Sequence, residues 1–136
     1  KNKFVLQMST GLGNSEINRY DNFMEKYGHN QRIHFLHMGG SVTGHVKFVP
    51  RFIDWIQREF DVYTDTSRAL AFGPHFLIKE CMEKNDNSLK RIMFASDEPW
   101  GIFPAELALL RHLGLEKTLR YRILFYNANM LYCHGD

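Results

Sequence analysis

The sequence predicts an α/β fold built from four consecutive β-α units. Four apolar segments rich in β-branched and large residues begin roughly every 30 residues, the length of one βαβ unit. Each is followed by a segment whose apolar residues recur at helical spacing. This alternation indicates a parallel sheet covered by helices, either an open doubly wound sheet or half of a (β/α)₈ TIM barrel. No linker or low-complexity stretch divides residues 1–136, so we expect a single domain.

The first two units occupy residues 1–57. A strand is expected at residues 3–8, then a turn-rich loop and a helix that begins near Ser15. Gly28 should end that helix in the left-handed conformation. The second strand is expected at residues 32–37, and the following helix should start close to Pro50, which is tolerated only in a first turn.

The last two units are expected to place strands at residues 61–66 and 91–96. A helix at 74–84 separates them, and the fourth strand must end near Asp97 because Pro99 cannot donate to a strand ladder. Two helices should close the chain, at residues 105–112 and 116–131. The second carries an apolar stripe at i, i+4, i+7 and i+11, formed by Leu119, Ile123, Tyr126 and Met130.

Composition excludes several classes of function. The net charge of +2 is small and the basic residues are scattered, which argues against a nucleic-acid partner. No apolar run approaches the ~20 residues of a membrane span, so no membrane role is expected. Cys81 and Cys133 lie far apart and outside any metal-ligand spacing. They are read as free thiols, which favours a reducing compartment and a cytoplasmic location.

The candidate site lies at the carboxyl ends of the strands, where sites occur in parallel α/β folds. His37 shares a side of its strand with Ile33 and Phe35, and Asp97 follows the same alternation on the fourth strand, so both are predicted to face one cavity. Together they form a plausible pair for metal binding or acid–base chemistry. The alternative is that His37 hydrogen-bonds a loop carbonyl while Asp97 caps the next helix. His34, with the opposite parity, is expected to be packed or hydrogen-bonded.

Four segments resemble motifs of the amidohydrolase-related metal-dependent hydrolases and decarboxylases. Residues 33–40 (IHFLHMGG) look like their H-x-G-G strand end, and residues 61–67 (DVYTDTS) resemble their n-v-Y-x-D-x-S seventh strand. Residues 94–101 (FASDEPWG) resemble the F-G-S-D-x-P-W-G eighth strand, and residues 123–131 (ILFYNANML) the closing helix. The resemblance implies a (β/α)₈ barrel in which this chain supplies strands five to eight.

The same resemblance implies a divalent metal, zinc first and manganese second. Asp97 would bind the metal or hold and deprotonate its water, and His37 would bind the metal or polarise the substrate. The substrate class would be a small carboxylate or a lactone-like molecule, which is hydrolysed or decarboxylated without oxidation. Arg68 and Trp100 near the rim are candidate substrate contacts, and so is Ser9. Ser9 stands where the family usually has the fifth-strand His, and the first-strand His pair is not in this chain.

A half-barrel would leave two sheet edges unpaired and its inner apolar face open to water. The expected partner is therefore the complementary N-terminal half-barrel, with a second copy of this chain as the other choice. The missing fifth-strand His leaves a second hypothesis, a catalytically inactive barrel or half-barrel that acts as a binding or structural module. An unrelated doubly wound domain is disfavoured, because Gly11-Leu12-Gly13 lacks the third glycine of a phosphate loop.

Overall fold

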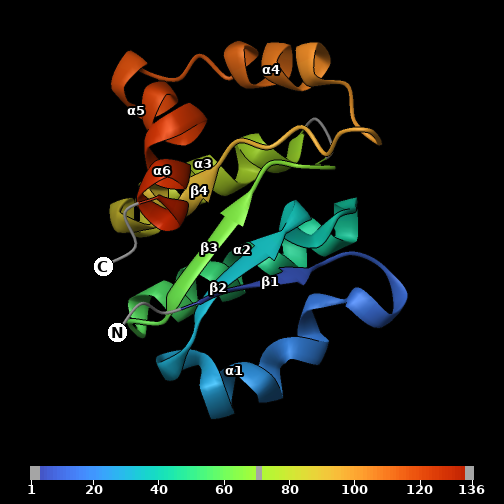
Figure 1. Cartoon of the computed structure of the whole chain (residues 1–136), viewed down its shortest axis with the longest axis vertical. Coiled ribbons are helices and arrows are strands. Elements are labelled where there is room, and N and C mark those ends of the chain that lie inside the picture. The colour runs from blue at the N-terminus through green and yellow to red at the C-terminus, as the bar shows by residue number, and fades with distance from the viewer. Residues whose placement is uncertain (1–3, 70–71, 134–136) are drawn as a thin grey trace.

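The computed structural model describes residues 4–69 and 72–133, which form one four-stranded parallel sheet with helices (Figure 1). The strand order is β1-β2-β3-β4, which confirms the predicted α/β class and the parallel sheet. The strands are β1 (Val5–Ser9), β2 (Arg32–Leu36), β3 (Asp61–Asp65) and β4 (Ile92–Met93). In register, Gln7 lies beside His34 and His34 beside Tyr63. Since β1 and β4 each have one strand neighbour among the described residues, they are the sheet edges.

The helices follow the predicted order along the chain. They are α1 (Asp21–Tyr27), α2 (Val42–Gln57), α3 (Phe72–Lys84), α4 (Phe103–His112), α5 (Lys117–Tyr121) and α6 (Asn127–Tyr132). A π-helical turn, Arg122–Tyr126, joins α5 to α6. Short 3-10 turns cover Gly13–Ser15, Ile17–Tyr20, Gly28–Asn30, His37–Gly39 and Asp86–Arg91. None of the helices in the described part of the chain is long and apolar enough to cross a membrane.

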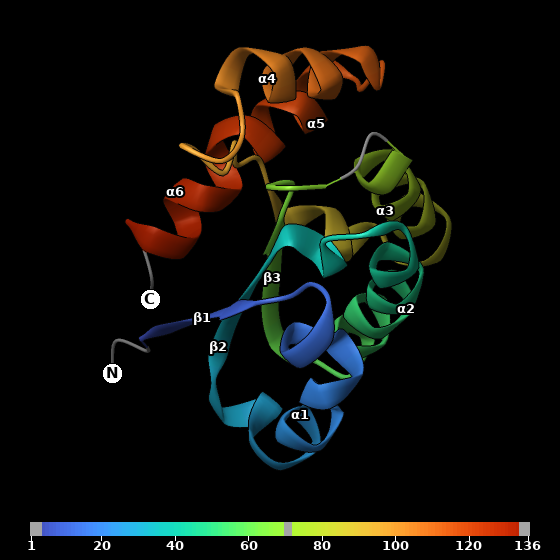
Figure 2. The same ribbon diagram turned by 90° about the vertical axis from the view of Figure 1, so that its right-hand side faces the viewer.

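The core lies between the sheet and the helices α2 and α3, which cover the same face (Figure 2). Phe35 of β2 stacks on Trp55 of α2, with ring centroids 5.1 Å apart, and meets Phe48 edge-on. The residues on this face alternate along each strand with those on the other face, as a pleated strand requires. Ile33, Phe35, Val62 and Ile92 are all fully buried there.

The opposite face of the sheet is mainly polar. It carries Gln7, His34, Tyr63 and Asp65, whose positions alternate with the core residues. The prediction that the inner face of a half-barrel would be apolar is therefore wrong for this chain. Two of these side chains, Gln7 and His34, hydrogen-bond to the hydroxyl of Tyr132, which α6 brings to this face.

The structure corrects several predicted details. The first α-helix begins at Asp21, not near Ser15, and it ends at Gly28 as predicted, although the conformation of Gly28 differs. Helix α2 begins at Val42, because the Ser41 hydroxyl caps it by accepting from the Gly44 N–H at 3.0 Å, so Pro50 lies inside the helix. Gly28 has a right-handed φ of −56°, and its missing side chain makes room for the ring of Phe60. Strand β4 ends at Met93, since beyond it the chain bonds to side chains and to the C-terminal helix.

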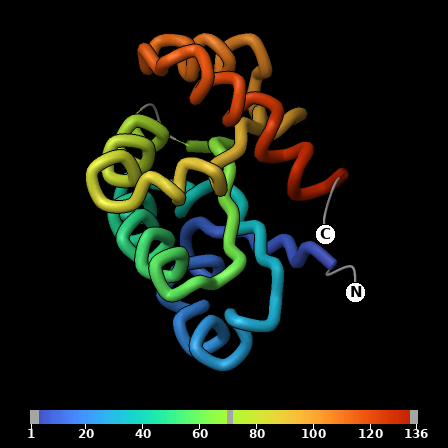
Figure 3. The backbone as a smooth tube through the Cα atoms, turned by 90° about the vertical axis from the view of Figure 1, so that its left-hand side faces the viewer, coloured from blue at the N-terminus to red at the C-terminus, as the bar shows by residue number. Residues whose placement is uncertain are grey.

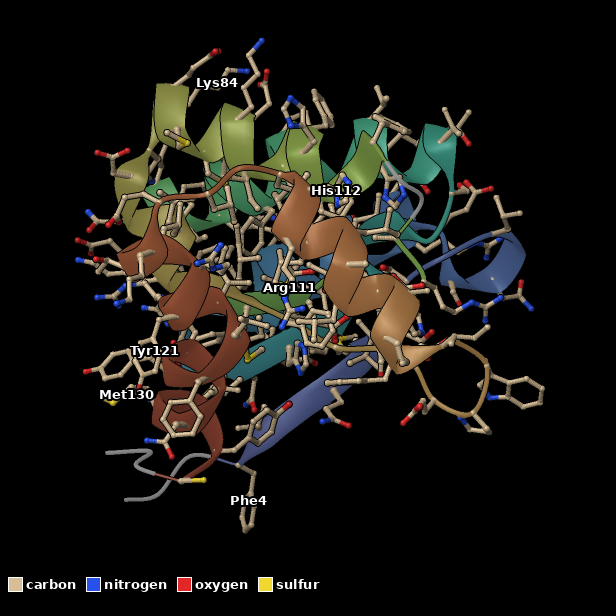
Figure 4. All side chains as sticks on the ribbon, turned by 90° about the horizontal axis from the view of Figure 1, so that it is seen from above. Phe4, Lys84, Arg111, His112, Tyr121 and Met130 are labelled. Atoms are coloured by element: carbon tan, nitrogen blue, oxygen red, sulfur yellow. The ribbon has the colours of Figure 1, made fainter. Side chains whose placement is uncertain are left out.

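The C-terminal helical segment confirms the helix predicted at 116–131 but corrects its buried face. Figure 3 shows α5, the π turn and α6 as one continuous rod. Ile123 is buried as expected, but Tyr126 and Met130 are exposed, and Asn127 and Leu131 are buried in their place. The π turn widens the helix locally, so the buried positions fall four residues apart and the later half of the stripe faces outward. Met130 points away from the sheet in Figure 4.

Candidate active site at the strand ends

His37 reaches the open face of the sheet through a backbone turn. Ile33 and Phe35 are buried against the helices, so the predicted alternation would have placed His37 on the wrong face. The strand ends at Leu36, and both His37 (φ 69°) and Met38 (φ 39°) take left-handed backbone conformations that redirect the chain. As a result, the His37 side chain lines a cavity of about 310 Å³ at the carboxyl ends of the strands.

Asp97 lies in the same cavity, as predicted, after the end of β4. Its side chain is 15% exposed, and Oδ2 is buried without a hydrogen-bond partner among the described residues. Its one ion pair among the described residues is with Arg68, whose Nε lies 3.7 Å from Oδ2. A buried carboxylate oxygen that accepts no hydrogen bond costs free energy, which a bound cation or a proton offsets.

Asp97 does not cap the next helix, so that alternative is wrong. Helix α4 begins at Phe103 with Ile102 at its N-cap position. Instead, the Asp97 carbonyl accepts from the N–H groups of Trp100 and Gly101, both at 2.8 Å, which closes a tight turn. A Cβ on Gly101 would lie 1.8 Å from the Ser96 carbonyl oxygen, so glycine alone fits this turn and fixes the approach of Asp97.

Sequence reasoning missed the carboxylate that organises the site, Asp65 at the end of β3. Its Oδ1 accepts from the N–H groups of Ser67 at 2.9 Å and His37 at 3.2 Å, and from the Ser67 hydroxyl. Its Oδ2 lies 2.8 Å from His34 Nε2. Burial alone would raise the pKa of Asp65, but the interactions with His34, Ser67 and the His37 backbone outweigh it and hold that pKa below its usual range.

His34 is buried and hydrogen-bonded, as expected. Its Nδ1 lies 2.5 Å from the hydroxyl of Tyr132, which also accepts from Gln7 Nε2 at 2.8 Å. The alternation of side chains along β2 and β3 could have predicted the contact between His34 and Asp65, since both lie on the same face of neighbouring strands. No pattern in the sequence indicated that Tyr132 joins this network, because it lies near the opposite end of the chain from Gln7 and His34.

A second hollow of about 230 Å³ adjoins the larger cavity at His37. Ser9 and Arg68 line it, and His37 borders both this hollow and the larger cavity. Trp100 is 82% exposed and does not line either of them. The structure therefore brings His37 and Asp97 together and places Ser9 and Arg68 beside them, while Trp100 stands outside.

His37 and Asp97 fit part of a metal site. The Oδ2 of Asp97, which accepts no hydrogen bond among the described residues, is a suitable ligand atom, and an imidazole is a good ligand for zinc. Within residues 4–69 and 72–133, however, no group of three or more His, Cys, Asp or Glu side chains could hold a metal ion. Catalytic zinc sites usually have three protein ligands, so these two residues would share a metal with ligands from outside the described chain.

Comparison with known proteins supports the fold. The sequence matches no protein-family model and no curated protein. Among solved structures it is similar to 2,6-dihydroxybenzoate decarboxylase from Rhizobium, with a TM-score of 0.56, 18% identity and coverage of 78% of this chain. It is also similar to 5-carboxyvanillate decarboxylase LigW from Sphingomonas paucimobilis, with a TM-score of 0.55, 13% identity and 85% coverage.

The chain spans about a third of these enzymes, 36% of the length of each. It therefore has the α/β fold found in part of two decarboxylases. The resemblance to the amidohydrolase-related hydrolases and decarboxylases, first drawn from four motifs, is confirmed at the level of the fold.

Proposed function

We propose that this chain supplies strands five to eight of an amidohydrolase-type (β/α)₈ barrel, and that the complete barrel is a metal-dependent enzyme. The observation that carries the proposal is the buried Oδ2 of Asp97, which accepts no hydrogen bond among the described residues and lies in a cavity that it shares with His37. Both residues lie at the carboxyl ends of parallel strands, the position of catalytic groups in barrel enzymes. The match to part of two decarboxylases supports the same enzyme class.

The proposed reaction is the non-oxidative decarboxylation of a small carboxylate, with hydrolysis of a lactone-like substrate as the second form. We favour decarboxylation because both solved neighbours are decarboxylases, and their names point to aromatic carboxylates. In this reaction the bond between carbon and the carboxylate breaks, its electron pair stays on the carbon and takes up a proton, and CO₂ leaves.

Asp97 and His37 would carry the chemistry. A divalent metal, zinc or manganese, would supply Lewis-acid polarisation and lower the pKa of a bound water toward ~7. Asp97 would move the proton, to carbon in decarboxylation or away from the attacking water in hydrolysis. His37 would bind the metal or hold the substrate through its ring.

Arg68 and Ser9 are placed to bind the substrate. Both line the hollow that His37 shares with the main cavity. The guanidinium of Arg68 is suited to a substrate carboxylate, which it would pair with in two parallel hydrogen bonds. Trp100, highly exposed in this chain, would contact a substrate only if another part of the barrel brings the substrate to it.

The partner we propose is the complementary N-terminal half-barrel, which would pair with both edges of the sheet and complete the metal ligands. A second copy of this chain is the other choice. We place the enzyme in the cytoplasm, since both cysteines are free thiols.

A catalytically inactive binding module remains the second candidate function. One observation favours it, the neutral hydroxyl of Ser9 where an imidazole ligand is expected. Metal binding separates the two candidates, because the module has no need of a metal.

The test uses the intact protein, supplied with Zn²⁺ or Mn²⁺ and offered 2,6-dihydroxybenzoate, 5-carboxyvanillate and an aryl lactone. We expect CO₂ release from an aromatic carboxylate that stops when a chelator removes the metal. Lactone hydrolysis without CO₂ release would select the second form of the reaction. Metal-replete protein without turnover of either substrate class would refute the enzyme and favour the module.

A further inference from the structure

Two N–H groups determine the hydrogen-bonding role of one oxygen beside His37. The Asp65 Oδ1 lies 2.9 Å from the N–H of Ser67 and 3.2 Å from the N–H of His37. A backbone N–H can only donate, so Oδ1 is an acceptor. The Ser67 hydroxyl also contacts Oδ1 at hydrogen-bonding distance, and its single proton must therefore point at that oxygen.

This leaves the Ser67 hydroxyl oxygen as an acceptor toward His37. The His37 Nδ1 lies 2.7 Å from Ser67 Oγ, and no proton remains on Oγ to donate to it. The hydrogen of this bond must come from the ring, so Nδ1 carries it. In a neutral imidazole the other nitrogen, Nε2, then holds the lone pair.

The arrangement is held rigidly. Asp65 is 2% exposed and Ser67 is 4% exposed, so neither side chain exchanges its bonds freely with water. The second carboxylate oxygen, Asp65 Oδ2, is also engaged, because it lies 2.8 Å from His34 Nε2. Among the described residues, the His37 Nε2 makes no hydrogen bond, and His37 lines both cavities.

We infer that Asp65 and Ser67 are positioning residues that lock His37 in the Nδ1–H tautomer and leave Nε2 available as a metal ligand or a proton acceptor. The functional meaning of this lock rests on the function proposed above, in which His37 acts in the site. When the His37 ring is neutral, its Nε2 therefore offers a lone pair and cannot donate a hydrogen bond to the substrate. Partners that orient a histidine ligand in this way are typically worth 10- to 100-fold in metal affinity or activity.

The experiment is long-range ¹H–¹⁵N NMR on the intact metal-free protein labelled at histidine, which reports which ring nitrogen carries the proton. His37→Gln assigns the His37 signals. We expect a protonated Nδ1 and an unprotonated Nε2 in the neutral ring. Ser67→Ala should abolish this preference and Ser67→Thr, which keeps the hydroxyl, should restore it.

His45 is the internal control. Its Nδ1 donates to the Met38 carbonyl at 2.8 Å, so it should show the Nδ1–H signature in every variant. A protonated Nε2 at His37 in the unmodified protein overturns the inference, even if Ser67→Ala does not fold. An unchanged His37 signature in folded Ser67→Ala overturns it too. An Nδ1–H signature in a protein that turns over no substrate supports the lock and refutes the proposed function, so the two failures are distinct.

Discussion

Replacing Asp97 by Asn should remove activity at almost no cost in stability. The one ion pair of Asp97 among the described residues is with Arg68, at 3.7 Å, and the Arg68 side chain is 64% exposed. Such a pair contributes roughly 0–1 kcal/mol, because water screens it. The free energy of unfolding should therefore change by less than about 1 kcal/mol. Turnover should fall at least ~100-fold, the usual contribution of a positioned acid or base.

Asp61→Asn is the matched control with the opposite expectation. Asp61 begins β3 at the other end of the sheet and holds Arg32 Nε at 2.8 Å and Arg91 Nη1 at 2.5 Å. Hydrogen bonds to charged groups contribute about 1.5–3 kcal/mol each. Since Asn can still accept one of them, we expect a loss of about 2 kcal/mol in stability and no change in turnover.

Urea unfolding followed by circular dichroism measures the stability of both variants, and CO₂ release measures turnover in the same preparations. Equal m-values would show that the denatured states are comparable. Retained turnover in Asp97→Asn would refute the role of Asp97. So would a loss of stability as large as that of Asp61→Asn, because the carboxylate would then be a structural one.

Three further predictions concern the core, acid stability and the Asp97 turn. Phe35→Ala should lower the free energy of unfolding in urea by about 3–5 kcal/mol, because the ring is fully buried against Trp55, and a loss below about 1 kcal/mol would contradict this packing. Burial raises the pKa of Asp61, but bonds from its two arginine partners outweigh this and lower it from 3.8. The unfolded chain then binds the proton at higher pH, so Tm should fall as the pH drops through 3.8 and below, and Asp61→Asn should show a shallower fall. Gly101→Ala should cut turnover about 100-fold and leave Tm nearly unchanged. A Cβ at this position would lie 1.8 Å from the Ser96 oxygen, so the exposed turn that holds Asp97 has to move. Unaltered turnover would show that this turn does not position Asp97.

Much of the fold was predictable because it follows from local rules. Apolar segments separated by turn residues located four strands, and helical periodicity located the helices between them. The fold class needed only their order. The errors fell where a neighbour in space decides the outcome, as at Gly28, which is small because Phe60 packs against it. The π turn in the last helix likewise changed which side chains are buried without breaking the apolar pattern.

The site was predictable in part. Asp97 stood out because a carboxylate directly follows an apolar strand and precedes Pro99 and Gly101. His37 was correctly chosen for the cavity but by the wrong argument, since alternation cannot foresee a strand end at positive φ. The Asp65 network joins residues on β2 and β3, and its geometry depends on the register of neighbouring strands.

The most direct test of the proposed metal-dependent site is the metal content of the intact protein, measured by elemental analysis after purification without chelators. We predict about one tightly held Zn²⁺ or Mn²⁺ per barrel. We also predict that metal is lost in Asp97→Asn and retained in Asp61→Asn. An intact protein that binds no divalent metal when it is supplied, or an Asp97→Asn variant that holds as much as the unmodified protein, would contradict the assignment of Asp97 to a metal centre.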